Sequence, residues 1–187
     1  MLNFFRNKLV ALIIAVVAVG TSTLVSVNAK LSSACEAQEA AFFTAREGKA
    51  PGRYIDQQIS AAAALATVGG HYASLERDVA ALRDARTALV RAYEDRDIPD
   101  ICEAAGKLER QVETFEDVLG RYPLSAEDKS AAEDAFDTVY GARKMIADSS
   151  YNADVRAFNS RVYNAFPANV FAELLNIDEP ELYAEED

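Results

Sequence analysis

Tryptophan is absent from this 187-residue chain, and histidine, cysteine, methionine, glycine and proline are all scarce. Few β-branched runs occur, and no strand-like alternation of apolar and polar residues persists beyond a handful of positions. Alanine and leucine are plentiful instead. The composition therefore predicts an all-α protein, and the length is sufficient for one domain with a sizeable core.

The single histidine, His71, argues against most catalytic sites. A nucleophilic triad needs a histidine near a serine or cysteine and a carboxylate, and no such motif surrounds His71. Di-iron bundles need Glu-x-x-His motifs, and position 68 is a valine. No zinc-spaced cluster and no glycine-rich phosphate loop occurs. We expect His71 at a surface or helix cap, no catalytic residue, no metal or cofactor site, and no enzymatic activity.

Acidic residues outnumber basic ones, 30 to 19. Three of the basic residues precede Leu31 and none of the acidic ones does, so the rest of the chain carries a formal charge of −14. Such a charge repels nucleic acid and anionic lipid surfaces. We therefore expect no nucleic-acid partner, and contact with a membrane only through an anchor.

One long uncharged run, Leu9–Val27, follows a short basic head at residues 1–8. Its 19 residues can span a bilayer, whereas a secretory signal usually has an apolar region of about 7–15 residues. The sequence favours a transmembrane anchor over residues 9–29, with a signal cleaved after Val27-Asn28-Ala29 as the alternative and lipidation at Cys35 as a weaker one. The basic head should stay in the cytoplasm. The prediction is a single-pass protein of the cell membrane whose helical domain lies outside the cytoplasm.

Apolar residues then recur at helical spacing as far as Asn164, with interruptions at Gly48–Gly52 and Pro123. Asp97 and Ser125 are expected to cap the helices that follow them, and the last helix is predicted to run unbroken from Ala126 to Asn164. The clearest apolar seam consists of Ile101, Ala105, Leu108, Val112, Phe115, Leu119 and Tyr122.

The pair Gly69-Gly70 decides the topology. An unbroken helix from Tyr54 to Glu94 would be about 60 Å long, and a reversal before it would drive the acidic bundle into the bilayer. A reversal at Gly69-Gly70 gives an antiparallel up-down four-helix bundle within residues 31–177. A kink at this pair is the competing interpretation. The acidic segment 178–187 is expected to be a disordered tail.

The two cysteines, Cys35 and Cys102, are expected as separate thiols. In this bundle they lie about 15 Å apart along the helices, well beyond the ~7 Å that a disulfide can bridge.

Two asparagines, Asn152 and Asn159, lie one heptad apart on an apolar seam with Val155, Val162 and Phe166. A buried asparagine is costly unless its amide is paired, but it can fix the register between helices. We predict that both amides make structural contacts that pair the last helix with the bundle. Pro167 ends this helix, and residues 168–175 are expected to form a short helix that folds back on the bundle.

This stretch resembles the LemA family of bacterial membrane-anchored proteins. The likeness rests on the order and spacing of Tyr151, Asn152, Val155, Arg156, Phe158, Asn159, Phe166, Pro167 and Asn169. A weaker likeness extends from Ile55 to Arg86. The chain departs from the family in lacking its usual tryptophan, basic pair and Leu-Ile-Pro run, and in its acidity.

The resemblance implies one N-terminal span, a bundle of long helices, and no catalytic residues to assign. We expect a non-enzymatic, membrane-anchored scaffold or adaptor that binds protein partners whose identity the sequence does not specify. The alternative is a ligand-binding or sensory domain outside the cytoplasm, with a small polar pocket near Tyr151, Asn152 and Asn159.

Overall fold

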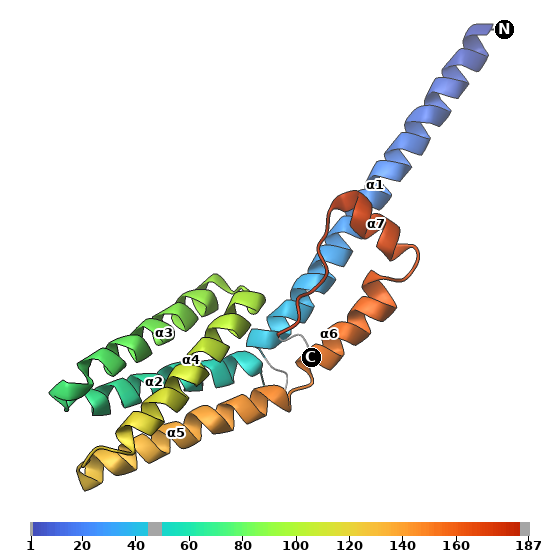
Figure 1. The fold of residues 1–187 in the computed structure, drawn as a ribbon. Coiled ribbons are helices and arrows are strands. Elements are labelled where there is room, and N and C mark those ends of the chain that lie inside the picture. Colours follow the sequence, from blue (N-terminus) through green and yellow to red (C-terminus); the bar gives the residue numbers. More distant parts are fainter. Residues whose placement is uncertain (1, 45–49, 184–187) are drawn as a thin grey trace. The chain divides into compact units, whose positions relative to one another are not determined.

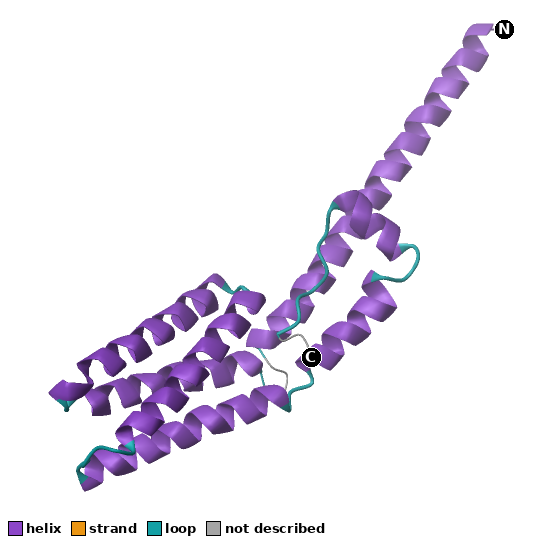
Figure 2. Ribbon diagram, in the orientation of Figure 1, coloured by secondary structure: helices purple, strands orange, loops and turns teal. Residues whose placement is uncertain are grey.

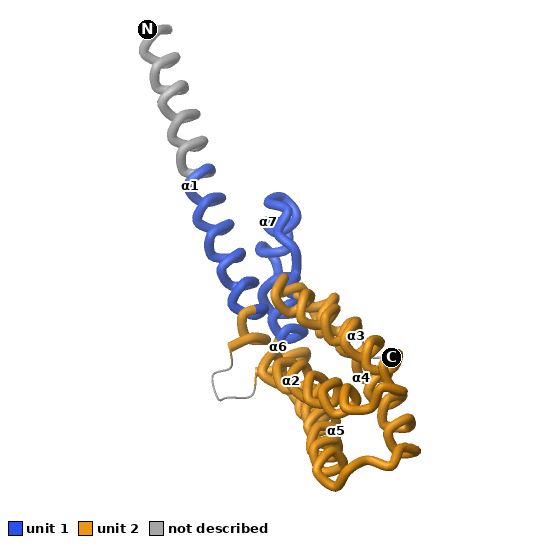
Figure 3. The backbone as a smooth tube through the Cα atoms, turned by 90° about the vertical axis from the view of Figure 1, so that its left-hand side faces the viewer, with its two compact units in different colours: residues 1–39, 155–180 blue, residues 40–154, 181–187 orange. Residues whose placement is uncertain are grey.

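The fold was obtained as a computed structural model that describes residues 2–44 and 50–183, with side chains from residue 21 onward. All regular elements in these ranges are helical, which confirms the predicted all-α class (Figure 1; Figure 2). The chain divides into two compact units (Figure 3). Residues 1–39 and 155–180 form unit 1, and residues 40–154 and 181–187 form unit 2.

Unit 2 contains a four-helix bundle. Helix α2 packs antiparallel against α3 and α5, and α3 packs against α4 (Figure 1). Side chains of α4 and α5 close the bundle, since Arg143 lies 3.3 Å from both Glu109 and Glu113. The antiparallel packing that was predicted for the helices is therefore confirmed in this bundle, whereas residues 31–39 and 155–177, which were also assigned to it, belong to unit 1. Its elements are α2 (Pro51–Gly70), the 3-10 turn η1 (Ala73–Leu75), α3 (Glu76–Asp95), α4 (Ile98–Leu119) and α5 (Ala126–Ala147).

The core of the bundle follows the predicted seam of α4. Tyr122, the last residue of that seam, lies beyond the end of α4 and is only partly buried. Burial of each large apolar side chain contributes about 1.5–3 kcal/mol, so this seam supplies much of the stability of the bundle. The buried members are Ile101, Ala105, Leu108, Val112, Phe115 and Leu119.

The end of α2 comes unusually close to its neighbours at Gly69. A Cβ atom there would lie 2.5 Å from Cζ of Phe115 and 2.6 Å from Cγ2 of Val79. Only glycine fits without displacing these side chains. After α2 the chain turns back through His71 and Tyr72, so the predicted reversal is confirmed and the alternative of a kink is wrong.

Capping contacts fix the helix starts in the bundle. Asp97 caps α4, and Ser125 Oγ accepts a hydrogen bond from the main-chain nitrogen of Asp128 (3.0 Å), which confirms both predicted caps. The Tyr72 hydroxyl donates to Asp128 (2.8 Å) and accepts from the main-chain nitrogen of Ser125 (3.0 Å). Nδ1 of His71 lies 2.8 Å from the carboxylate of Asp128. His71 is therefore an exposed residue that contacts the first turn of α5.

The predicted unbroken helix from Ala126 to Asn164 is wrong. It is divided into α5, α6 (Tyr151–Phe158) and a π-helical turn, η2 (Asn159–Tyr163). Residues 148–150 are Asp-Ser-Ser, whose short side chains compete with helical main-chain bonds. Ser150 accepts a hydrogen bond from the main-chain nitrogen of Asp154 (2.8 Å) and donates its hydroxyl to the Asp154 carboxylate (2.8 Å), which starts a new helix.

Unit 1 consists of α1 (Leu2–Phe43) as far as residue 39, the chain from Val155 through η2, and α7 (Ala168–Leu175). The bounds of α7 are those predicted for the short C-terminal helix. Its Ala172 is buried with Leu31 and Cys35 of α1. Phe158, Tyr163 and Ile177 pack around this small core.

Two residues of the predicted asparagine seam lie outside the core. Val162 is 40% exposed and Phe166 is 84% exposed, whereas Val155 is buried as expected. A π-helical turn adds residues to the turn and shifts the positions after it to another face. The change at η2 therefore explains why the helical spacing fails beyond Asn159.

Across the residues with described side chains, no helix is both long and apolar enough to cross a membrane. Residues 9–20 of the expected anchor have no described side chains, so the anchor stays a prediction. Residues 45–49, which include part of the predicted interruption at Gly48–Gly52, likewise lie outside the described residues. Cys35 and Cys102 are both free thiols, as expected.

Candidate functional site

The motif residues at the start of α6 hold the chain's own C-terminal segment. The Tyr151 hydroxyl donates a hydrogen bond to the main-chain oxygen of Glu181 (2.8 Å). Asn152 Oδ1 accepts a hydrogen bond from the main-chain nitrogen of Tyr183 (2.9 Å). Both bonds reach the backbone of a segment without regular secondary structure. Tyr151 and Asn152 therefore hold the main chain of this segment rather than its side chains.

Aromatic rings form one wall of this site. Phe42 is fully buried, and the Tyr183 ring stacks on it with a centroid distance of 5.4 Å and an interplanar angle of 25°. Tyr151 meets the same Phe42 ring edge-on at 5.3 Å. The site therefore binds a side chain as well as a backbone. We call Phe42, Tyr151 and Asn152, with the segment Glu181–Tyr183 that they hold, the Tyr183 site.

Polar groups lie near the hydroxyl of Tyr183. Burial, followed by the influence of Cys102 and Glu109, raises the pKa of Tyr183 above its ordinary value. The phenol is therefore neutral at physiological pH. Burial and Glu109 also raise the pKa of the Cys102 thiol, which is consequently a poor nucleophile.

Glu109 is held in place from two helices. It accepts a hydrogen bond from Gln58 Nε2 (2.8 Å) and pairs with Arg143 (3.3 Å). Gln58 is completely buried on α2, and its Oε1 has no hydrogen-bond partner within the described residues. An unpaired buried carbonyl is unfavourable by about 1–3 kcal/mol. Among the buried polar side-chain atoms that the structure describes in α2–α5, this oxygen is the one without a hydrogen-bond partner.

In unit 1 the second asparagine makes a related contact. Asn159 Nδ2 lies 3.4 Å from both the main-chain oxygen of Pro180 and the Glu179 carboxylate, and its Oδ1 is buried without a partner in the described residues. The Tyr163 hydroxyl donates to the main-chain oxygen of Ile177 (2.6 Å). Asn159 and Tyr163 therefore also bind the C-terminal segment, in residues 177–180.

The remaining predicted motif residues are placed differently. Phe158 packs on the core of unit 1, and Arg156 is exposed. Phe166 is exposed and precedes Pro167 through a cis peptide bond. Asn169 is exposed, and its Oδ1 accepts from the main-chain nitrogen of the next residue (2.9 Å). Tyr151, Asn152 and Asn159 of the motif make side-chain hydrogen bonds to the C-terminal segment.

The C-terminal segment is the part of the site that sequence reasoning missed. Residues 178–187 were expected to be disordered, but Glu179, Pro180, Glu181 and Tyr183 lie within hydrogen-bond distance of α6 or η2. Residues 184–187 lie outside the described residues. A usable signal was the apolar residues among the acids: Ile177, Pro180, Leu182 and Tyr183.

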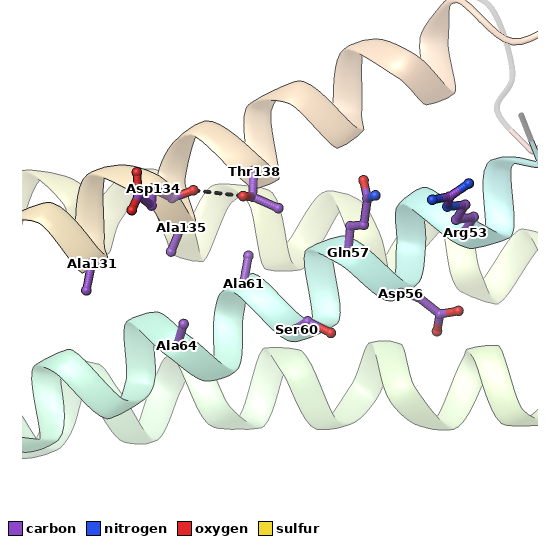
Figure 4. Close-up of a pocket in the computed structure, with 10 residues that line it drawn as sticks. All are labelled: Arg53, Asp56, Gln57, Ser60, Ala61, Ala64, Ala131, Asp134, Ala135 and Thr138. Carbon is purple, nitrogen blue, oxygen red and sulfur yellow. Dashed lines mark hydrogen bonds between the residues drawn. The ribbon is translucent and has the colours of Figure 1, made fainter. Parts of the chain in front are cut away.

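An open groove of about 560 Å³ between α2 and α5 is a second surface feature of unit 2 (Figure 4). Alanines from both helices line it, together with Arg53, Asp56 and Asp134. The Thr138 hydroxyl in the groove donates to the main-chain oxygen of Asp134 (2.7 Å), so it is bound to its own helix. Small side chains on both helices account for this groove without a ligand.

Metal chemistry finds no support in the part of the chain that the structure describes. No three His, Cys, Asp or Glu side chains there are grouped so that they could hold a metal ion. The acidic residues Glu133, Asp134 and Asp137 are exposed, as expected for a solvated helix face.

Comparison with protein-family models, with curated proteins and with solved structures finds no match to this chain. The resemblance to the LemA family therefore stays a prediction that rests on the motif residues.

Proposed function

We propose that this chain is a non-enzymatic, membrane-anchored scaffold or adaptor of LemA type that binds protein partners at the cell membrane. One observation carries the proposal: Tyr151 and Asn152 bind main-chain atoms of a segment without regular secondary structure. Hydrogen bonds to main-chain atoms give affinity for peptides of many sequences, and side-chain pockets add selectivity. A protein partner that offers an extended segment fits this chemistry.

The anchor supports the same proposal from the sequence. The run Leu9–Val27 would hold the bundle beside the membrane, and the acidic surface would keep the rest of the chain off anionic lipid. A tethered partner-binding site at the membrane is the role of a scaffold.

Site-directed photo-crosslinking in intact cells tests this function. A photoreactive amino acid at Ala153, an exposed α6 position next to Asn152, should give reproducible protein adducts. The same residue at the exposed Glu127 position, at the start of α5, is the control. The adducts should disappear when Asn152→Leu is introduced. If position 153 gives no protein adduct in the full chain or in a chain ending at Pro180, the scaffold proposal is wrong.

A ligand-sensing role is the second candidate, and the unpaired Gln58 Oε1 favours it. A small phenol could take the place of the Tyr183 side chain against Phe42. In a chain ending at Pro180, a soluble tyrosine amide should then raise the melting temperature. An unchanged melting temperature at millimolar ligand would remove this candidate.

A further inference from the structure

The C-terminal residues Glu181–Tyr183 occupy a site whose shape and chemistry suit a tyrosine. The Tyr183 ring stacks on Phe42, and its main-chain nitrogen is bound by Asn152. Tyr151 holds the chain two residues earlier through the main-chain oxygen of Glu181. Ring and backbone are thus recognised together.

Hydrogen bonds and a ring contact hold the segment in this site. The bond from the Tyr151 hydroxyl and the bond to Asn152 each involve a main-chain atom of the segment, and Glu181 is exposed while Leu182 is only partly buried. The tether adds to these contacts, since a short tether supplies an effective concentration in the millimolar range. A segment held in this way can be displaced by a peptide that makes additional contacts.

We propose that the Tyr183 site recognises a tyrosine-bearing extended segment of a partner protein, and that residues 181–183 are its intramolecular competitor. This inference rests on the proposed scaffold function and names the chemistry of the partner. The partner segment can then bind only when the chain's own segment leaves the site.

The surroundings of the hydroxyl set the selectivity. Glu109 lies within electrostatic range of it, and burial disfavours charge there. A phosphotyrosine would bring a second negative group toward Glu109 and is excluded. A phenylalanine keeps the ring stacking and is accepted, whereas an alanine loses it.

Fluorescence anisotropy with the purified full-length chain in detergent tests the exchange. The probe is a labelled nine-residue peptide of residues 179–187, capped at both ends. It should bind a chain ending at Pro180 at least about tenfold more tightly than the full chain, because the competitor is gone. Peptides with Phe at the tyrosine position should bind within a few-fold, and those with Ala or phosphotyrosine should not bind at millimolar concentration.

Two variants of the shortened chain complete the test. Asn152→Leu should weaken peptide binding by about two- to tenfold, and Asn164→Leu, at an exposed asparagine, should leave it unchanged. Equal binding by the full and shortened chains, equal binding of the Tyr and Ala peptides, or no binding at all would each overturn the inference.

The outcome is separable from that of the scaffold proposal. Protein adducts at position 153 together with failed peptide binding would leave a scaffold that recognises its partners in another way. Peptide binding without adducts in cells would support the recognition chemistry and overturn the scaffold role.

Discussion

Asn152 directs its side-chain oxygen to the main-chain nitrogen of Tyr183, and Asn159 directs its amide group to Pro180. Both amides were expected to pair one bundle helix with another. They bind the backbone of the C-terminal segment instead. Their heptad spacing has a simple geometric consequence, since it places the two polar groups on one side of the helix about two turns apart.

The hydrogen bond from Tyr183 to Asn152 gives a direct prediction. Asn152→Ala should weaken the attachment of residues 181–183 by about 0.5–1.5 kcal/mol, because the main-chain nitrogen of Tyr183 loses its hydrogen-bond acceptor. Amide hydrogen exchange of these residues should then accelerate by about two- to tenfold. Asn164→Ala is the matched control and should change nothing. Unaltered exchange in Asn152→Ala would contradict the structure of the site.

Asp128 provides a prediction about pH. Hydrogen bonds from Tyr72, Ser125 and His71 lower the pKa of its carboxyl group below the ordinary value of 3.8. A depressed folded-state pKa stabilises the fold above the ordinary value, and the contribution is lost as the pH falls through the lowered pKa.

The variant Asp128→Asn should therefore be less stable than wild type at neutral pH, and the difference should shrink in acid. Urea unfolding at neutral pH and at successively lower pH measures this. Glu127→Gln, which removes the same charge one residue earlier, is the control and should not reproduce the trend. A stability difference that stays constant down to strongly acidic pH would refute the assignment.

At the scale of helices, the periodicity of apolar residues was enough to predict a helix where that helix buries one continuous stripe of side chains. The α4 seam from Ile101 to Leu119 was predictable for that reason, as were the caps at Asp97 and Ser125. The break at residues 148–150 was not, because serine and aspartate are tolerated within helices as well as at their ends. The π-helical turn at η2 also leaves no signature in the spacing.

Gly69 and Gly70 form a matched pair at the end of α2. Gly69→Ala should destabilise the bundle by about 1–3 kcal/mol, since its Cβ would collide with Phe115 and Val79. Gly70→Ala should be neutral or stabilising by up to about 1 kcal/mol, because alanine reduces the freedom of the unfolded chain. The nearest atom to its Cβ is Nη2 of Arg83 at 3.8 Å, an ordinary contact.

Urea unfolding midpoints of the two variants, compared with wild type, measure these effects. Equal changes in both would mean that the close approach at Gly69 is not a packing requirement.

For the whole molecule, the C-terminal segment shows where sequence reasoning stops. Residues 151 and 181 meet across thirty positions of chain, and no local pattern encodes such a contact. Composition alone placed the acidic residues 178–183 in solvent. The tyrosine among them finds a buried aromatic partner, Phe42, from the other end of the sequence.

Attachment to the membrane through the N-terminal anchor is a prediction for the whole molecule. A chain held by residues 9–27 should remain with the membrane fraction through a carbonate wash, because an uncharged span of this length is stable in a bilayer. The mature protein should retain Met1, as measured by N-terminal mass spectrometry. Protease added outside spheroplasts should digest the bundle. A soluble protein beginning at Lys30, or a bundle fully protected from protease, would refute the anchor or its orientation respectively.

The ring cluster of Phe42, Tyr151 and Tyr183 has an optical consequence. The chain has eight tyrosines and no tryptophan, so its near-ultraviolet circular dichroism comes almost entirely from tyrosine. A tyrosine fixed against another ring gives a strong dichroic band, whereas a freely rotating one gives little. The near-ultraviolet circular dichroism of the protein should therefore differ between chains whose Tyr183 site is occupied and chains whose site is empty. The spectrum of unlabelled protein would then report the fraction of chains with the segment bound.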